Sequence, residues 1–400
     1  MTPRPLKKAL VTATGLTVLF LYGATSAWAD CPSKVNSSAD GPLRMRMLVL
    51  GDSIMWGQGL KQEQKFWWRV KCWLEEKTGR EVTEKVMAHS GAHLDSALTA
   101  PPKFSSNNGE VNLPFPTVNQ QLDLAREFYG SDRLKVDLVL VDGCVNDVGV
   151  SNLLDATTAP DSLPPRIIGP CLNGMHALLR RITSSFPNSQ VLVTGYYRFV
   201  SSETDDNAFL RQLVKKISSG KPEARRMTDK QMRDRLITIS ELWYKVSTAS
   251  LKEAVEKVNA ELRAKDLPPA VTFVEIGFSP EHSFAAANTL LWTFVFGSTN
   301  LSGFRKVIVT LSFGTAAYKP DDDVRESRVK SCNETFKLPK GIKESKLEKR
   351  SREDDLLICR YASLGHPNQM GALIYTEAIK GKLQWLIDKA AKKRNALNPQ

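Results

Sequence analysis

The sequence has few of the residues and spacings that mark metal-binding or nucleic-acid-binding proteins. Its 400 residues include only five His and six Cys, and no two Cys have the C-x-x-C spacing that is common in zinc sites. The basic residues are scattered, and no zinc-finger, RNA-binding or helix-turn-helix signature is present. We therefore expect no metal, no cofactor and no nucleic-acid partner.

Long hydrophobic runs are also scarce, and the clearest one lies near the N-terminus. Three basic residues precede the apolar run from Ala9 to Ala24, and Ala27-Trp28-Ala29 supplies a small-x-small cleavage site. The run is shorter than the ~20 apolar residues that a spanning helix needs, which argues against an uncleaved membrane anchor. We predict a signal peptide over residues 1–29, a periplasmic or secreted protein, and no transmembrane segment after cleavage.

Acidic residues are fewer than basic ones, with 43 Asp and Glu against 55 Lys and Arg. Loss of the three basic residues in 1–29 would lower the formal net charge from +12 to +9. A basic surface can favour anionic lipids or acidic polysaccharides. Because these residues are not clustered, we interpret most of the charge as a solvated surface.

All six cysteines lie after the predicted cleavage site, and export to an oxidising compartment permits disulfides. Six cysteines allow 15 pairings, which the sequence alone does not resolve. We predict at least one disulfide and favour Cys332 with Cys359, which would tie a charged segment back to the C-terminal part of the chain.

Hydrophobic residues make up 42% of the chain, a proportion typical of globular proteins, and they form alternating strand-like and helix-like patterns. The strands are expected at 44–50, 82–88, 136–141, 190–194 and 271–276, and the helices at 62–78, 116–129, 172–186, 235–264 and 368–391. This alternation predicts a three-layer α/β/α sandwich with a central, mostly parallel sheet of about five strands. We expect 30–400 to form a single domain.

Two segments interrupt the pattern. Residues 159–170 are rich in Pro and predict a loop. Residues 296–355 alternate basic and acidic side chains with almost no apolar periodicity. We interpret 296–355 as a charged surface insertion without a core of its own.

Polar residues follow three of the expected strands. Gly51-Asp52-Ser53 follows the first strand, Ser90-Gly91 the second and Asn146-Asp147 the third, while His366 precedes the last helix. Ligands of an open parallel sheet gather at the carboxyl ends of its strands. A hydroxyl, a base and hydrogen-bond donors for an oxyanion would meet there, which is the minimum set for acyl transfer.

These residues resemble, in order and spacing, the four blocks of the SGNH (GDSL-type) hydrolases. The resemblance extends from about Arg44 to Leu386. It implies that Ser53 is the nucleophile and His366 the general base. It also implies an oxyanion hole made by the backbone N–H groups of Ser53 and Gly91 and the side-chain amide of Asn146.

Two positions depart from the family's pattern. Cys144 stands where the family has Gly, so a free thiol near the site is one expectation. Ser363 stands where the family has the Asp of an Asp-x-x-His block. Either a backbone carbonyl near 363 orients His366, or an acid from elsewhere in the chain does so, or the enzyme is slow. We favour the carbonyl, which predicts that Ser363→Ala changes kcat little, and we interpret Asp52 as a carboxylate that stabilises the loop.

The function expected from this resemblance is an exported serine esterase that hydrolyses carboxylic esters through an acyl-serine intermediate. One alternative is an O-acyltransferase that acts on a glycan, and another is a catalytically silent binding protein with the same fold. A shallow site built on loops is expected, with Trp56 as the best candidate to line an acyl pocket. The sequence leaves open whether the ester is a lipid, an acylated glycan or a small molecule.

Overall fold

A computed structural model describes residues 31, 44–95, 110, 116–205, 218, 221–296, 318–338 and 341–397. The predicted signal peptide lies outside this part of the chain. The centre of the fold is a five-stranded parallel sheet with the strand order β2-β1-β3-β4-β5. Its strands are β1 (Met45–Leu50), β2 (Val82–Val86), β3 (Leu138–Val141), β4 (Gln190–Thr194) and β5 (Val271–Val274).

Strands β1 and β3, in the interior of the sheet, are buried on both faces. The last four residues of β1, Met47 to Leu50, are fully buried, and Leu138 to Val141 of β3 are almost fully so. A parallel sheet that helices cover on both sides requires such continuous apolar runs. The same runs are visible in the sequence, which explains why the strand positions could be predicted correctly.

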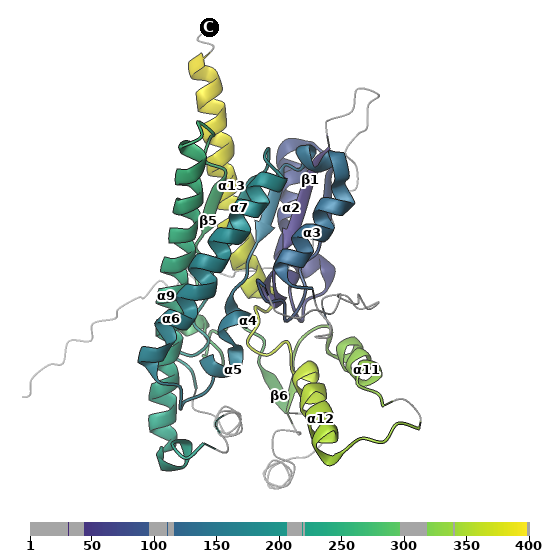
Figure 1. Cartoon of the computed structure of the whole chain (residues 1–400), viewed down its shortest axis with the longest axis vertical. Coiled ribbons are helices and arrows are strands. Elements are labelled where there is room, and N and C mark those ends of the chain that lie inside the picture. Colours follow the sequence, from purple (N-terminus) through teal and green to yellow (C-terminus); the bar gives the residue numbers. More distant parts are fainter. Residues whose placement is uncertain are drawn as a thin grey trace, which may run out of the picture.

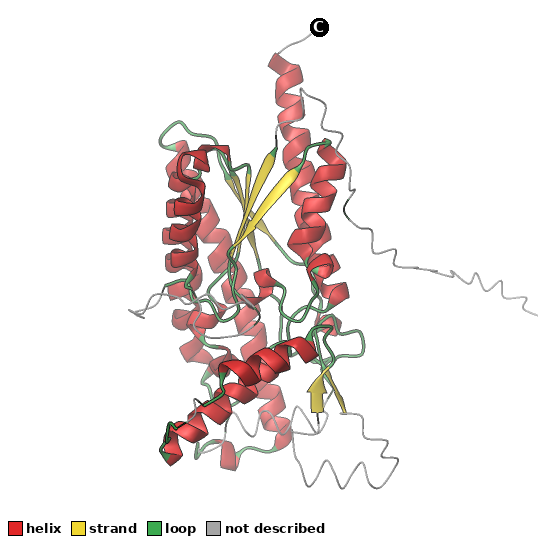
Figure 2. Ribbon diagram, turned by 90° about the vertical axis from the view of Figure 1, so that its right-hand side faces the viewer, coloured by secondary structure: helices red, strands yellow, loops and turns green. Residues whose placement is uncertain are grey.

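Helices cover both faces of the sheet. The larger ones are α2 (Phe66–Thr78), α3 (Val118–Tyr129), α7 (Met175–Ser185), α9 (Asp229–Arg263) and α13 (Gln369–Leu397). Helix α2 packs against α13 on one side, while α3, α7 and α9 pack in series on the other. Figure 2 shows the sheet between these two helical layers. The predicted three-layer α/β/α sandwich is confirmed.

The ends of these helices follow local sequence signals. Helix α2 ends at Gly79, whose φ of 65° is in the left-handed region that favours glycine. Thr117 and Thr228 form capping boxes at the starts of α3 and α9. None of the helices in the described ranges is both long enough and apolar enough to cross a bilayer.

The Pro-rich segment at 159–170 is helical, so the predicted loop is wrong. A 3-10 turn at Pro160–Ser162 leads into α6 (Leu163–Ile168) and a π-helical segment at Gly169–Gly174 that continues into α7. Proline is tolerated in the first turn of a helix, where its missing N–H would have no intrahelical partner. Leu163 and Ile167 are buried, and this burial stabilises the helix.

The described part of the charged insertion is also more ordered than its composition predicts. Its described part contains β7 (Tyr318–Pro320), paired with β6 (Phe294–Phe296), and two helices, α11 (Arg325–Thr335) and α12 (Lys346–Arg360). The disulfide Cys332–Cys359 joins the helices, and Phe336 packs beside it in a small apolar cluster. Figure 1 shows α11 and α12 together at the end of the molecule opposite the C-terminus.

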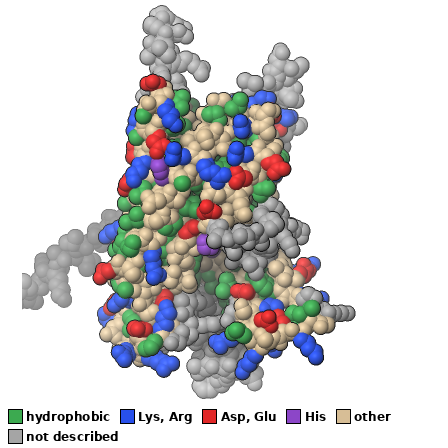
Figure 3. All heavy atoms as spheres, viewed as in Figure 1, with side chains coloured by type: hydrophobic (Ala, Val, Ile, Leu, Met, Phe, Trp, Pro, Cys, Tyr) green, Lys and Arg blue, Asp and Glu red, His purple; other side chains and the backbone are tan. Residues whose placement is uncertain are grey.

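Three disulfides use all six cysteines, and the favoured Cys332–Cys359 pairing is confirmed. The others are Cys31–Cys72 and Cys144–Cys171. The expected free thiol near the site is therefore wrong, because Cys144 is bonded. Figure 3 shows basic and acidic side chains interspersed on the visible face, in agreement with a solvated charged surface.

Replacing Cys332 and Cys359 with Ala should destabilise α11 and α12 locally, by about 3 kcal/mol for a loop of this length. Hydrogen exchange of the α12 amides measures this effect. The double variant at Cys144 and Cys171 is a matched control, because both disulfides span 27 residues. That control should leave α12 exchange unchanged, and equal acceleration in both variants would contradict the prediction.

Candidate active site

The four predicted blocks meet in one cavity at the carboxyl ends of the strands. Ser53, Gly91, Asn146 and His366 all line this cavity, which has a volume of about 370 Å³. Ser53 begins the short helix α1 (Ser53–Trp56) after β1, and Asn146 lies in α4 (Val145–Val148) after β3. The structure thus brings together the residues that the sequence analysis selected.

The turn before Ser53 is held from two neighbouring elements. The Asp52 N–H donates to Asp142 Oδ1 at 2.8 Å, beyond the end of β3. The Gln121 side chain on α3 accepts from the Gly51 N–H at 2.8 Å and donates to the Gly51 carbonyl at 2.9 Å. A Cβ atom at residue 51 would lie 2.0 Å from Asp142 Oδ1, and φ is +147° there. Only glycine therefore fits this turn.

Asp52 stabilises the turn and does not line the cavity. Its Oδ1 accepts from the Ile54 N–H at 2.8 Å as the N-cap of α1, and Tyr196 donates its hydroxyl to Oδ2 at 2.8 Å. Burial raises the pKa of Asp52 to about 6. Burial and the nearby Asp52 carboxylate raise the pKa of Asp142 well above its usual value. Two buried carboxyl groups this close favour a state in which one is protonated.

His366 lies within hydrogen-bond distance of Ser53, with 2.7 Å between Nε2 and the Ser53 Oγ. Its loop is fixed by backbone bonds to Trp292, whose carbonyl accepts from the Gly365 N–H at 3.0 Å and whose N–H donates to the His366 carbonyl at 2.7 Å. Tyr197 also donates its hydroxyl to the Gly365 carbonyl at 2.7 Å. This geometry suits transfer of the serine proton to the ring.

The environment of the ring lowers its basicity. If Nε2 accepts the Ser53 proton, Nδ1 must carry the ring's own proton. Nδ1 is buried and has no hydrogen bond among the described residues. Burial lowers the pKa of His366 to about 4, while the nearby backbone of Ser363 and Leu364 acts in the opposite direction.

The candidate oxyanion donors lie in the loops after β2 and β3. Gly91 has a φ of +77°, in the region where a side chain would be strained. The Asn146 side chain donates one N–H to the Ala92 carbonyl at 2.9 Å, which fixes the orientation of the amide. An amide nitrogen carries two protons, so a second N–H remains for a ligand in the cavity.

The wall of the cavity is mainly apolar and comes from several elements. It includes Ile54, Val145, Leu154, Phe199, Phe284 and Leu364. Ile358, near the end of α12, and Tyr361, which follows this helix, also contribute, so the helix that begins in the charged insertion reaches the site. The site is a hollow and not the shallow surface that was expected.

Trp56 does not line the cavity, so its predicted role in an acyl pocket is wrong. Its indole N–H donates to Glu110 Oε2 at 3.1 Å, and Lys65 Nζ lies 3.4 Å from the ring centroid. These polar and cationic partners hold the indole beside the turn that carries Ser53. Trp56 therefore supports that turn from outside the cavity.

Sequence reasoning missed several residues that support the site. Asp142 comes directly after an expected strand, and this position is a signal in the sequence that could have identified it as a site residue. Gln121 lies within a helical pattern, and Glu110, Asp322 and Arg328 lie in segments without apolar periodicity. No feature of the neighbouring sequence distinguishes these four residues from polar residues on a solvated surface.

No family model matches the chain, and no curated protein matches its sequence. Solved structures with a similar fold include a lipase from a goat rumen metagenome, with 16% identity over 61% of this chain and 88% of that chain, and a TM-score of 0.37. They also include a phospholipase A1 from Streptomyces albidoflavus, with 12% identity over 65% and 89% of the two chains and a TM-score of 0.35. A family 3 carbohydrate esterase from Clostridium thermocellum has 14% identity over 62% and 86%, and a TM-score of 0.31.

The low pKa of His366, about 4, predicts the pH dependence of Ser53 reactivity. If the neutral imidazole of His366 is the base, as the sequence analysis expects, the rate of Ser53 labelling by a fluorophosphonate should stay constant down to about pH 5. It should then fall about tenfold per unit below pH 4, as the ring is protonated. Labelling rates between pH 3.5 and 8 measure this profile, and an acid limb near the ordinary histidine value of 6.5 would contradict it.

Proposed function

We propose that this protein is a serine ester hydrolase that forms an acyl-Ser53 intermediate on esters with an apolar acyl group. The observation that carries the proposal is the 2.7 Å contact between His366 Nε2 and Ser53 Oγ in an apolar cavity. A nucleophile and a base in hydrogen-bond reach, beside aligned donors, are what acyl transfer requires.

In the acylation step, Ser53 Oγ attacks the ester carbonyl carbon as its proton moves to His366 Nε2. The carbonyl oxygen becomes negative and accepts hydrogen bonds from the backbone N–H groups of Ser53 and Gly91 and from the Asn146 amide. The tetrahedral intermediate then expels the alcohol oxygen, which takes the proton from His366. Ser53 is left acylated and the alcohol departs.

In the deacylation step, water takes the place of the alcohol. His366 accepts a proton from the water as its oxygen attacks the acyl carbon, and the same donors stabilise the second oxyanion. The intermediate breaks the bond to Ser53 Oγ, which recovers its proton from His366. The products are a carboxylic acid and the free enzyme, and the chain's own groups and water suffice for both steps.

The shape of the site supports an apolar acyl group. Ser53 and His366 lie at a cavity walled by aliphatic and aromatic side chains, and burial of each acyl CH₂ contributes about 0.8 kcal/mol. The polar atoms of the ester would remain at the Ser53 end. A fatty acyl ester fits these surroundings better than an acetyl group, which would leave most of the apolar wall uncovered.

The geometry favours catalysis over the alternative of a silent binding protein. A binding protein would have no need for a serine-to-imidazole contact of 2.7 Å with a neutral ring. We also propose that the protein acts outside the cytoplasm. The three disulfides support this location, because disulfides are rare in reducing compartments.

Ser53→Ala should remove ester hydrolysis by at least about 10³-fold, because the covalent route is lost. The substitution removes one oxygen from a turn that other side chains hold, so the thermal midpoint should change little. Turnover of p-nitrophenyl esters measures the activity, and Ser184→Ala on the exposed surface of α7 is the control. Undiminished turnover by folded Ser53→Ala protein would refute the proposed mechanism.

The apolar cavity predicts a dependence on acyl length. The kcat/KM for p-nitrophenyl esters should rise from acetate to octanoate, because added CH₂ groups are buried. Leu154→Trp, which fills part of the cavity, should lower kcat/KM for octanoate about tenfold or more and leave acetate within about twofold. Leu267→Trp, at an exposed position outside the cavity, is the matched control. A flat dependence on acyl length in the unaltered protein would contradict the assignment of an acyl pocket.

A further inference from the structure

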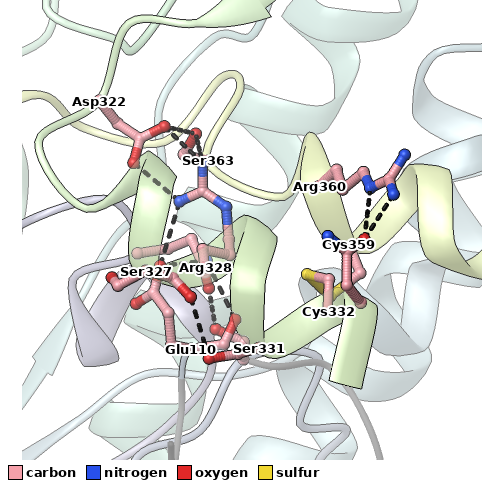
Figure 4. The surroundings of a disulfide bond; sticks show 12 residues. Glu110, Asp322, Ser327, Arg328, Ser331, Cys332, Cys359, Arg360 and Ser363 are labelled. Carbon is pink, nitrogen blue, oxygen red and sulfur yellow. Dashed lines mark hydrogen bonds and ion pairs between the residues drawn. A yellow bond between two sulfur atoms is a disulfide. The ribbon is translucent and has the colours of Figure 1, made fainter. Parts of the chain in front are cut away.

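A fully buried arginine from the charged insertion lies beside the proposed catalytic histidine. Arg328 on α11 forms a bidentate pair with Asp322, with 2.8 Å between Nη1 and Oδ1, and a second contact between Nη2 and Oδ2. Both side chains have no exposed surface. Figure 4 shows Arg328 between Asp322 and Glu110, with Ser363 beside Asp322.

This pair is connected to the turn that carries His366. The Ser363 hydroxyl donates to Asp322 Oδ2 at 2.7 Å and accepts from Arg328 Nη2 at 3.0 Å. The Ser363 carbonyl in turn accepts a hydrogen bond from the backbone N–H of His366 at 3.0 Å. Fixing the Ser363 side chain therefore fixes the turn that orients the imidazole.

The other side of the arginine is connected to the loop that carries Gly91. Arg328 Nη1 contacts Glu110 Oε1 at 3.1 Å, and the same oxygen accepts from Gln58 Nε2 at 2.8 Å. Gln58 Oε1 accepts from the hydroxyl of Ser90, the neighbour of Gly91. One chain of polar contacts thus runs from the loop of Gly91 to the turn of His366.

The charges in this cluster are balanced. Glu110 and Asp322 are two carboxylates, and Arg328 and the buried Lys65 are two cations that interact with them. Burying ionised groups is costly unless they are paired and hydrogen-bonded. A cluster that is buried beside the site at such a cost is a candidate for a functional role.

We propose that Asp322 and Arg328 are positioning residues that hold His366 through Ser363, in place of the carboxylate that residue 363 lacks. This inference rests on the proposed hydrolase function. It differs from a dyad supported only by main-chain carbonyls, because it gives the Ser363 hydroxyl and the insertion a part in the reaction. We therefore now expect Ser363→Ala to lower kcat, in contrast to the expectation from the sequence alone.

The two charges also act on the ring in opposite directions, which makes the role testable. Arg328 lowers the pKa of His366 and Asp322 raises it. Asp322→Asn should shift the acid limb of kcat/KM to lower pH, and Arg328→Gln should shift it to higher pH. A salt bridge remote from the ring, such as Glu344–Arg352, would not move the pKa of His366 in opposite directions.

The experiment compares Asp322→Asn and Arg328→Gln with Glu344→Gln. The control breaks the ion pair between Glu344 and Arg352, also in the insertion but with no contact to Ser363 or His366. We expect kcat to fall by about tenfold to hundredfold in the first two variants, with KM changed less than about threefold. NMR titration of His366, assigned with a His366→Gln protein, should show the two opposite shifts directly. Folded variants with the kcat and His366 titration of the Glu344→Gln control would overturn the proposal.

Loss of a buried charge can prevent folding, so smaller changes complete the test. Ser363→Ala leaves the Asp322–Arg328 pair intact and removes only its link to the turn. It should lower kcat by about tenfold at unchanged KM, and kcat within about twofold of the unaltered protein would overturn the proposal. If the unaltered protein cleaves no ester and takes no fluorophosphonate, the hydrolase function fails. The NMR titration then still decides whether the pair acts on His366.

Discussion

The hydrogen bond between His366 Nε2 and Ser53 Oγ joins residues 313 positions apart, and the rest of the site is arranged to hold its two ends. The serine end is a tight turn after β1, fixed by Asp142 and Gln121 from neighbouring elements. The histidine end lies in a loop fixed by Trp292. A displacement of about 1 Å at either end would cost about 10²-fold in rate, so both ends need rigid support.

The residues that hold the Ser53 turn bury polar groups at a place where apolar side chains would make the fold more stable. Asp52 and Asp142 are buried beside each other under the Ser53 turn, and burial raises the pKa of both. Burial raises the pKa of Asp52 from its ordinary value of 3.8 to about 6. Between these two pH values, the Asp52 carboxyl group binds more protons in the folded state than in the unfolded state. The contribution of Asp52 to the free energy of unfolding is therefore present at low pH and is lost as the pH rises through that window. The fold carries this cost because the same carboxylates hold the turn.

Much of the fold could be predicted from the sequence because its signals are local. Met47 to Leu50 form an uninterrupted apolar run, and Gly51-Asp52-Ser53 follows it directly. The support around His366 could not be predicted, because Asp322 and Ser363 are 41 positions apart and only tertiary packing brings them together. The Pro-rich segment was misread for a similar reason, since burial of Leu163 and Ile167 overrides its composition.

The weak basicity of His366 has consequences for the proposed catalytic mechanism. A base with a pKa of about 4 accepts the Ser53 proton less readily than an ordinary histidine, and the imidazolium formed in the transition state needs compensation. In the serine proteases an adjacent carboxylate supplies it. Here the carboxylate of Asp322 is the acidic group that favours the charged ring, and Arg328 opposes it. Burial is the main cause of the weak basicity, and these two buried charges of the insertion adjust it in opposite directions.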